Sequence, residues 1–175
     1  CKESHNLRAI FLTGEGDAFS AGGDVKDMAT KQDNNSLEEK TNSLRRIMGV
    51  SELLYTLPIP SISIINGAAA GAGFAIALAC DMRIATENAK FVTAFSKIAF
   101  SGDFGGSYFL TKIIGTAKAR ELFYLSEAID AEKAKDLGIV NNIIDSSEID
   151  EYTTLLKNKF NNLAPIAIKY MKKNL

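Results

Sequence analysis

Two short segments rich in glycine and alanine carry the most specific chemical signal in the sequence. They span residues 18–26 (AFSAGGDVK) and 66–74 (NGAAAGAGF), and each follows a stretch that is predicted to be a buried strand. Small residues let a ligand lie against the backbone, and the start of a helix offers N–H groups that have no intrahelical partner. If one N–H from each segment converged on a single point, the pair would form an oxyanion hole, which stabilises the enolate of a thioester.

The second segment also allows a plainer interpretation. Gly71 and Gly73 do not continue into the dinucleotide-binding pattern G-x-G-x-x-G, because position 76 is Ile76, and the segment has no P-loop lysine. Small residues also permit close packing of a helix on a strand. Taken alone, the residues favour this structural role about as strongly as they favour a ligand site.

Asp103 is the carboxylate best placed for proton transfer. It lies in the segment 101–106 (SGDFGG), just before a predicted helix, and aromatic residues flank it at positions 95, 100, 104, 108 and 109. An apolar wall of this kind would raise the pKa of the Asp103 carboxyl group toward the range of a useful proton shuttle. The alternative role is that of an N-cap for the following helix, a position that aspartate favours.

The elements that hold these residues alternate between strands and helices. Hydrophobic spacing, glycine and proline predict strands over residues 7–12, 61–65, 81–85, 90–93 and 139–144. They predict helices over residues 37–57, 71–80, 107–114, 117–125, 131–137, 147–163 and 165–173, and a glycine-containing turn over 19–25. This alternation predicts an α/β fold.

Composition narrows the class of protein further. The chain has 175 residues, enough for one domain with a sizeable core, and 46% of them are hydrophobic while 23% are charged. A net charge of −1 gives no basic surface for nucleic acid or for an anionic membrane. The two cysteines, Cys1 and Cys80, form no disulfide framework and favour a reducing compartment, either the cytoplasm or the matrix of an organelle. No group of His, Cys and Asp residues has the spacing of metal ligands.

The two glycine-rich segments together resemble the two signatures of the crotonase (enoyl-CoA hydratase/isomerase) superfamily. The resemblance continues through residues 91–95, 105–115 and 131–140, and residues 134–140 (AKDLGIV) are similar to the family's A-x-x-x-G-L-V segment. It implies the crotonase spiral of repeated strand–strand–helix units over residues 1–175. Family members extend further at both ends, so we expect terminal strands and helices to be missing from this sequence.

The resemblance also implies roles for individual residues of this sequence. Its oxyanion-hole amides fall on Gly23 and Ala72, where alanine keeps the backbone donor. The two glutamates of its hydratases fall on Ala75 and Phe95, neither of which can transfer a proton. Asp103 matches the aspartate of dienoyl-CoA isomerases and of the ring-modifying isomerases of phenylacetate breakdown. The resemblance places the other contacts to the acyl-CoA at Ala21, Asp24, Val25, Lys26, Gly71, Ala75 and Phe95, with Lys26 near a phosphate or simply exposed.

These matches imply an isomerase that moves a double bond in an unsaturated acyl-CoA with Asp103 as the acid and base. One alternative is a hydratase that uses Asp103 with help from the substrate, and another is a subunit that binds acyl-CoA without turnover. The implied reaction needs no cofactor apart from the coenzyme A of the substrate and no metal. The implied assembly is a homotrimer or a dimer of trimers.

Overall fold

Two four-stranded sheets form the centre of the computed structural model, which describes residues 7–24 and 35–175. The first sheet has the order β1-β3-β5-β8, and all of its strand pairs are parallel. The second has the order β2-β4-β6-β7, with an antiparallel pair only between β6 and β7. The strands are β1 (Ile10–Thr13), β2 (Ala18–Ser20), β3 (Ser61–Ile65), β4 (Ala68–Ala70), β5 (Met82–Thr86), β6 (Lys90–Val92), β7 (Ile129–Asp130) and β8 (Asn142–Ile144).

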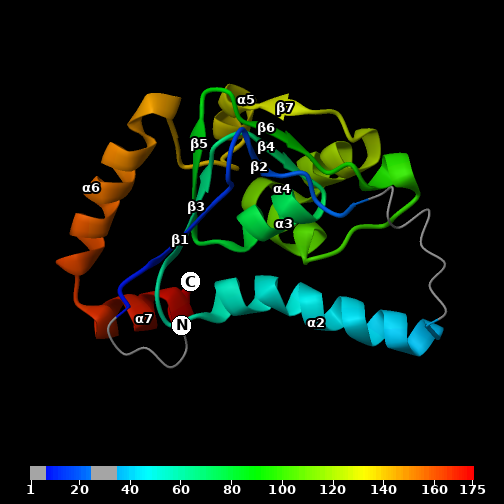
Figure 1. Cartoon of the computed structure of the whole chain (residues 1–175), viewed down its shortest axis with the longest axis horizontal. Helices are drawn as coiled ribbons and strands as arrows, with labels where there is room; N and C mark the ends of the chain where they lie inside the picture. The colour runs from blue at the N-terminus through cyan, green and yellow to red at the C-terminus, as the bar shows by residue number, and fades with distance from the viewer. Residues whose placement is uncertain (1–6, 25–34) are drawn as a thin grey trace.

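The chain repeats a unit that consists of one strand from each sheet followed by a helix. The strands β1 and β2 precede α2 (Leu37–Thr56), and β3 and β4 precede α3 (Ala72–Ala79). The strands β5 and β6 precede the short 3-10 helix η1 (Phe95–Ile98) and α4 (Gly106–Leu125). Figure 1 shows the strands close together with α2 crossing below them. The predicted α/β class with repeated strand–strand–helix units is therefore confirmed.

Helices cover both faces of the first sheet, because the apolar side chains of its inner strand β3 point alternately to the two faces. Ile62 and Ile64 of β3 pack in one apolar cluster with Leu156 of α6 (Ile149–Asn161). The next residue along the strand, Ile65, belongs to the other cluster, which also holds Phe74 of α3 and residues of α4. Successive residues of a strand point to opposite faces, so β3 is buried from both sides, with α6 along the outer edge in Figure 1.

The ends of the helices follow local sequence signals. Ser36 caps α2 by accepting a 3.2 Å hydrogen bond from the Glu39 N–H, and the Glu39 carboxylate accepts one of 2.7 Å from the Ser36 N–H. Asp130 caps α5 (Ala131–Asp136), because its carboxylate accepts a hydrogen bond from the Lys133 N–H at 2.8 Å. Gly115 has a φ of 78° and interrupts α4, which agrees with the two helices predicted there.

The second sheet was not predicted in full. Residues 19–25 were predicted as a turn, yet Phe19 and Ser20 belong to β2. β4 and β7 are also additional strands, and the predicted strand 139–144 begins only at Asn142. These strands have two or three residues and pair with distant segments, so their own sequences carry little strand signal. The last elements, η2 (Ser146–Glu148), α6 and α7 (Pro165–Asn174), match the predicted C-terminal helices within a few residues.

No helix within residues 7–24 and 35–175 combines the length and the hydropathy that a membrane span requires.

Candidate functional site

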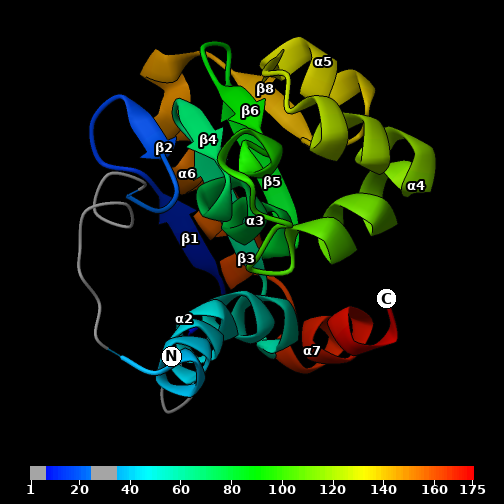
Figure 2. The same cartoon turned by 90° about the vertical axis from the view of Figure 1, so that its right-hand side faces the viewer.

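The two glycine-rich segments meet at the start of α3. A Cβ on Gly22 would lie 2.8 Å from the Ala70 carbonyl oxygen and 3.4 Å from the Ala72 nitrogen. Gly22 has a φ of 84°, a conformation that glycine adopts without the steric cost of a side chain. The backbone of the first segment therefore lies against the backbone of the second. Figure 2 shows the same neighbourhood, with β2 beside β4 and α3.

The start of α3 carries no side-chain cap. Its N-cap is Gly71, with a φ of 51°, and its first residue is Ala72. The Gly71 N–H donates to the Val92 carbonyl at 3.0 Å, which fixes this turn to β6. Because the first N–H groups of a helix have no intrahelical acceptor, the Ala72 N–H is a donor that a ligand oxygen can use.

Ser20 ties the first turn to α3. Its hydroxyl accepts a 3.3 Å hydrogen bond from the Gly22 N–H, and a Cβ on Gly73 would overlap the Ser20 side chain. Gly73 is therefore required for the close approach of α3 to β2. The small residues therefore do permit close packing of a helix on a strand, as the plainer interpretation of the sequence expected. This packing occurs beside the candidate donors and leaves them in place.

Ala75 and Phe95 lie in the interior and fill it with apolar atoms. Ala75 is on α3, and a Cβ on Gly106 of α4 would lie 3.0 Å from its Cβ, so the two helices pack closely at this point. Phe95 on η1 is buried and stacks on Phe123 of α4, with ring centroids 6.1 Å apart. A Cβ on Gly71 would lie 3.9 Å from the Phe95 ring.

Asp103 lies next to this aromatic pair. A Cβ on the preceding residue, Gly102, would lie 3.2 Å from the Phe123 ring and 3.7 Å from the Phe95 ring. The Oδ1 atom of Asp103 is buried and has no hydrogen-bond partner among the described residues. Loss of contact with water raises the pKa of the Asp103 carboxyl group above its usual value.

Asp103 does not cap the helix that follows it. The N-cap of α4 is Gly105, and no side chain makes a capping hydrogen bond there. Only the Asp103 carbonyl takes part in the turn, by accepting from the Gly106 N–H at 3.0 Å. The alternative in which Asp103 is merely an N-cap is therefore wrong.

Phe95 connects the two parts of the site. Its ring contacts the positions of both Gly71, which precedes Ala72, and Gly102, which precedes Asp103. The residues directly before the candidate donor and the candidate proton carrier therefore border the same aromatic ring. The aromatic wall differs from the expected one, since Phe100 and Tyr108 are half exposed, with exposed fractions of 51% and 52%. Phe123, which no nearby motif indicated, replaces them.

The remaining predicted contacts lie in or after the first turn. Ala21, Gly23 and Asp24 are exposed and adjoin Gly22. Val25 and Lys26 lie outside the described residues. Among residues 7–24 and 35–175, no group of three His, Cys, Asp or Glu side chains is arranged to hold a metal ion.

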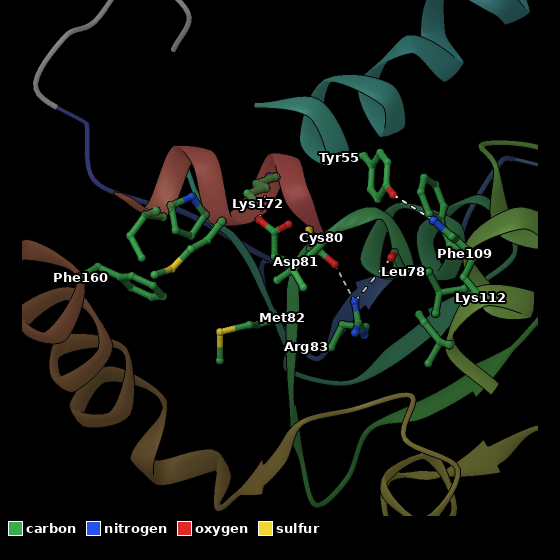
Figure 3. A pocket seen from close by; sticks show the side chains of 15 residues that line it. Tyr55, Leu78, Cys80, Asp81, Met82, Arg83, Phe109, Lys112, Phe160 and Lys172 are labelled. Atoms are coloured by element: carbon green, nitrogen blue, oxygen red, sulfur yellow. Dashed lines mark hydrogen bonds and ion pairs between the residues drawn. The ribbon is translucent and has the colours of Figure 1, made fainter. Parts of the chain in front are cut away.

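A separate cavity of about 450 Å³ lies at the opposite ends of the strands, between β5, α4 and α7 (Figure 3). Its polar groups already have partners. Arg83 donates to the Cys80 carbonyl at 2.6 Å, and Lys172 forms a 2.7 Å ion pair with Asp81. None of the residues that line this cavity belongs to the two glycine-rich segments, so we assign these groups a structural role.

Comparison with known proteins identifies the family. The profile of the enoyl-CoA hydratase/isomerase family matches residues 1–175. A short-chain-enoyl-CoA hydratase of Clostridium acetobutylicum is 33% identical over 167 residues, which is 94% of this chain and 62% of that protein. The chain spans 42% to 62% of the length of four curated relatives that it matches.

Solved structures agree with this. The crystal structure of an enoyl-CoA hydratase from Polaromonas sp. JS666 is 34% identical, with a TM-score of 0.88 over 95% of this chain and 65% of that one. A Thermobifida fusca protein whose structure was solved in complex with acetoacetyl-CoA is 27% identical, with a TM-score of 0.84 over 95% of this chain and 68% of that one. The chain therefore belongs to the enoyl-CoA hydratase/isomerase family, within the crotonase superfamily.

Proposed function

We propose that the chain carries the active site of an acyl-CoA double-bond isomerase, with Asp103 as the proton carrier. The observation that supports this most directly is the buried Oδ1 of Asp103, which has no hydrogen-bond partner among the described residues. A buried carboxylate oxygen without a partner is costly, and it is retained where it has a reaction to perform. The raised pKa brings the carboxyl group closer to the pH at which it exchanges protons.

The proposed reaction is a proton transfer between two carbons. The Asp103 carboxylate takes a proton from C2 of a 3-enoyl-CoA, and the electrons of the C–H bond move into the thioester to form a dienolate. The protonated Asp103 then returns the proton to C4, so that the double bond ends between C2 and C3. One acid–base group is sufficient for this sequence, and neither a metal nor a redox cofactor takes part.

The backbone N–H groups of Gly23 and Ala72 are the proposed oxyanion hole. The position of Ala72 at the start of α3 and the packing of Gly22 against it support this pairing. Two donors of this kind stabilise the dienolate oxygen more strongly than the neutral thioester oxygen, because they are fixed in place before the charge develops. Ala72→Gly should therefore keep activity, since glycine has the same N–H.

The proposed substrate is an unsaturated acyl-CoA, and the family relative that was crystallised with acetoacetyl-CoA supports this class of ligand. We propose that Ala21, Asp24, Val25, Lys26, Gly71, Ala75 and Phe95 contact the substrate. A homotrimer or a dimer of trimers is the proposed assembly, and the cytoplasm or an organelle matrix is the proposed location.

Hydration is the second candidate, and the name of the Clostridium relative favours it. Addition of water requires a group that deprotonates the water and a group that protonates the substrate. The two positions that match the hydratase glutamates hold Ala75 and Phe95, which cannot exchange protons. A hydratase would therefore depend on Asp103 and on the substrate alone.

A product assay in water labelled with heavy oxygen separates the candidates. The protein is incubated with 3-enoyl-CoA and, separately, with 2-enoyl-CoA, and the products are analysed by mass spectrometry. We expect unlabelled 2-enoyl-CoA from the first substrate and little labelled 3-hydroxyacyl-CoA from the second. Rapid incorporation of label would establish hydration, and binding of both substrates without turnover would establish a non-catalytic subunit.

A further inference from the structure

The side chain of Asn66 joins two loops that are far apart in the sequence. Asn66 directly follows β3, and its Oδ1 accepts a 3.1 Å hydrogen bond from the Gly14 N–H. Its Nδ2 donates to the Gly16 carbonyl at 2.8 Å. The Thr13 hydroxyl, at the end of β1, lies 3.4 Å from the same Oδ1 and donates to the Ile64 carbonyl at 3.0 Å. One carboxamide thus holds two residues of the loop between β1 and β2.

The backbones at this junction are in direct contact. A Cβ on Gly14 would overlap the Ala18 carbonyl, and a Cβ on Gly67 would overlap the Asp17 carbonyl. The Asp17 carbonyl thus lies directly against the Gly67 backbone just before β4, and the hydrogen bonds of Asn66 hold the loop in this position. The separation of β2 and β4 is fixed at the point where both strands begin.

Each of these strands leads within a few residues to one proposed oxyanion donor. β2 ends at Ser20, whose hydroxyl accepts from the Gly22 N–H directly before Gly23. β4 ends at Ala70, two residues before Ala72. We infer that Asn66 is a positioning residue of the oxyanion hole, whose carboxamide sets the spacing between the N–H groups of Gly23 and Ala72. This inference rests on the proposed function, because it assigns a task to the proposed donors.

A carboxamide is the side chain that this junction requires. The Gly14 N–H needs an acceptor and the Gly16 carbonyl needs a donor, and the two groups of an asparagine satisfy both at once. In Asn66→Asp the acceptor is kept, but a carboxylate oxygen then faces the Gly16 carbonyl. In Asn66→Ala both contacts are lost. Asn66→Asp therefore keeps one of these two contacts to the loop, and Asn66→Ala keeps neither.

Asn88 provides a matched control. It lines the same cavity of about 720 Å³ as Asn66, but its Nδ2 donates to the side chains of Glu87 and Ser146 and not to the loop. Asn88→Ala also removes a carboxamide group that lines this cavity, and it leaves the contacts of residues 13–17 in place. Activity and ligand spectra of this variant should equal those of the wild type.

The test measures polarisation of the thioester separately from turnover. An aromatic 2-enoyl-CoA with an ultraviolet absorption band is bound to each variant, because two N–H donors on the carbonyl oxygen shift such a band to longer wavelength. We expect the full shift in wild type and Asn88→Ala, a smaller one in Asn66→Asp and the smallest in Asn66→Ala. In the isomerase assay, Asn66→Ala should lose ~10²-fold in kcat, the order of effect that a displacement of about 1 Å causes, with KM little changed.

The outcomes separate this inference from the proposed function. An equal band shift in wild type and in a folded Asn66→Ala variant, as judged by circular dichroism, would overturn the role of Asn66 and leave the isomerase intact. A shift in wild type without isomerisation would overturn the isomerase, and the series of shifts would still decide the role of Asn66. Absence of any shift in wild type would overturn both the oxyanion hole and this inference.

Discussion

The rings of Phe95 and Phe123 stack with their planes 7° from parallel and their centroids 6.1 Å apart. Phe95 comes from η1 and Phe123 from the second half of α4, so the pair forms only when the chain folds. The backbone of Gly102 packs against both rings and delivers Asp103 to the edge of this apolar surface. Burial of the Asp103 carboxyl group, directly after a residue that packs on this stack, raises its pKa above the usual value.

The pH dependence of the reaction should follow this stack. Phe123→Leu opens the apolar surface, so the pKa of Asp103 should fall toward its usual value. Because the reaction begins with the ionised carboxylate, the acid limb of kcat/KM should move to lower pH. The control is Phe100→Leu, which changes an aromatic residue of the same region that is 51% exposed. An acid limb at the same pH in Phe123→Leu and wild type would exclude this cause of the pKa shift.

The stability of the fold should depend on the charge of Asp103. The pKa of Asp103 is raised above the model-compound value of 3.8 in the folded protein, so the folded state binds this proton more tightly than the unfolded chain. Stability is therefore lost as pH rises from 3.8 through the raised pKa. Asp103→Asn cannot ionise, and its Tm relative to wild type should be higher at pH 7 than at pH 3. A Tm difference that is independent of pH would contradict the burial of an ionised carboxylate.

Cys80 should be chemically inert in the folded protein. Burial raises the pKa of its thiol to about 11, and the nearby Arg83 guanidinium offsets only part of this effect. In a Cys1→Ser variant, the remaining thiol should react with an aromatic disulfide reagent at pH 8 at least ~10²-fold more slowly than a free cysteine, whose pKa is about 8.5. Unfolding in urea should restore the ordinary rate. Fast reaction of the native protein would show that Cys80 is accessible.

Lys172 should anchor α7 to the rest of the fold. Its ammonium group donates to the Leu54 carbonyl at 2.9 Å and to the Asp81 carboxylate at 2.7 Å. Figure 3 shows Lys172 beside Asp81. Lys172→Ala should lower the free energy of unfolding by about 2 kcal/mol, the usual range for hydrogen bonds to charged groups. Lys173→Ala, at an exposed neighbouring position, should change it little. Equal urea midpoints for the two variants would assign no stabilising role to the contacts of Lys172.

The sequence predicted the parts of the fold that local patterns encode. The run SISII at residues 61–65 and the helix that begins after Ser36 both occur where hydrophobic spacing predicted them. β4 was missed because it consists of three alanines, a residue type that is depleted in strands. It forms a strand because it pairs with β2 and β6, which is a tertiary effect.

The candidate site, like the fold, was predicted only in the parts that local sequence motifs encode. Asp103 and the glycine-rich turns could be recognised from local motifs. The role of Phe123 could not, because it lies 20 residues after Asp103, in the second half of α4. The contacts of Asn66 were also missed. The only signal was an Asn-Gly pair directly after a buried strand, and its partners at residues 13–16 lie about 50 positions earlier in the sequence.

The central claim is that Asp103 carries the proton, and Asp103→Asn tests it most directly. Asparagine keeps the shape of the side chain and cannot act as a base, so the rate of 3-enoyl-CoA isomerisation should fall by ~10²–10⁴-fold, the usual contribution of a general acid–base group. Affinity for an acyl-CoA, measured by calorimetry, should stay close to that of the wild type. Equal isomerisation rates in wild type and in the folded Asp103→Asn variant would contradict the account.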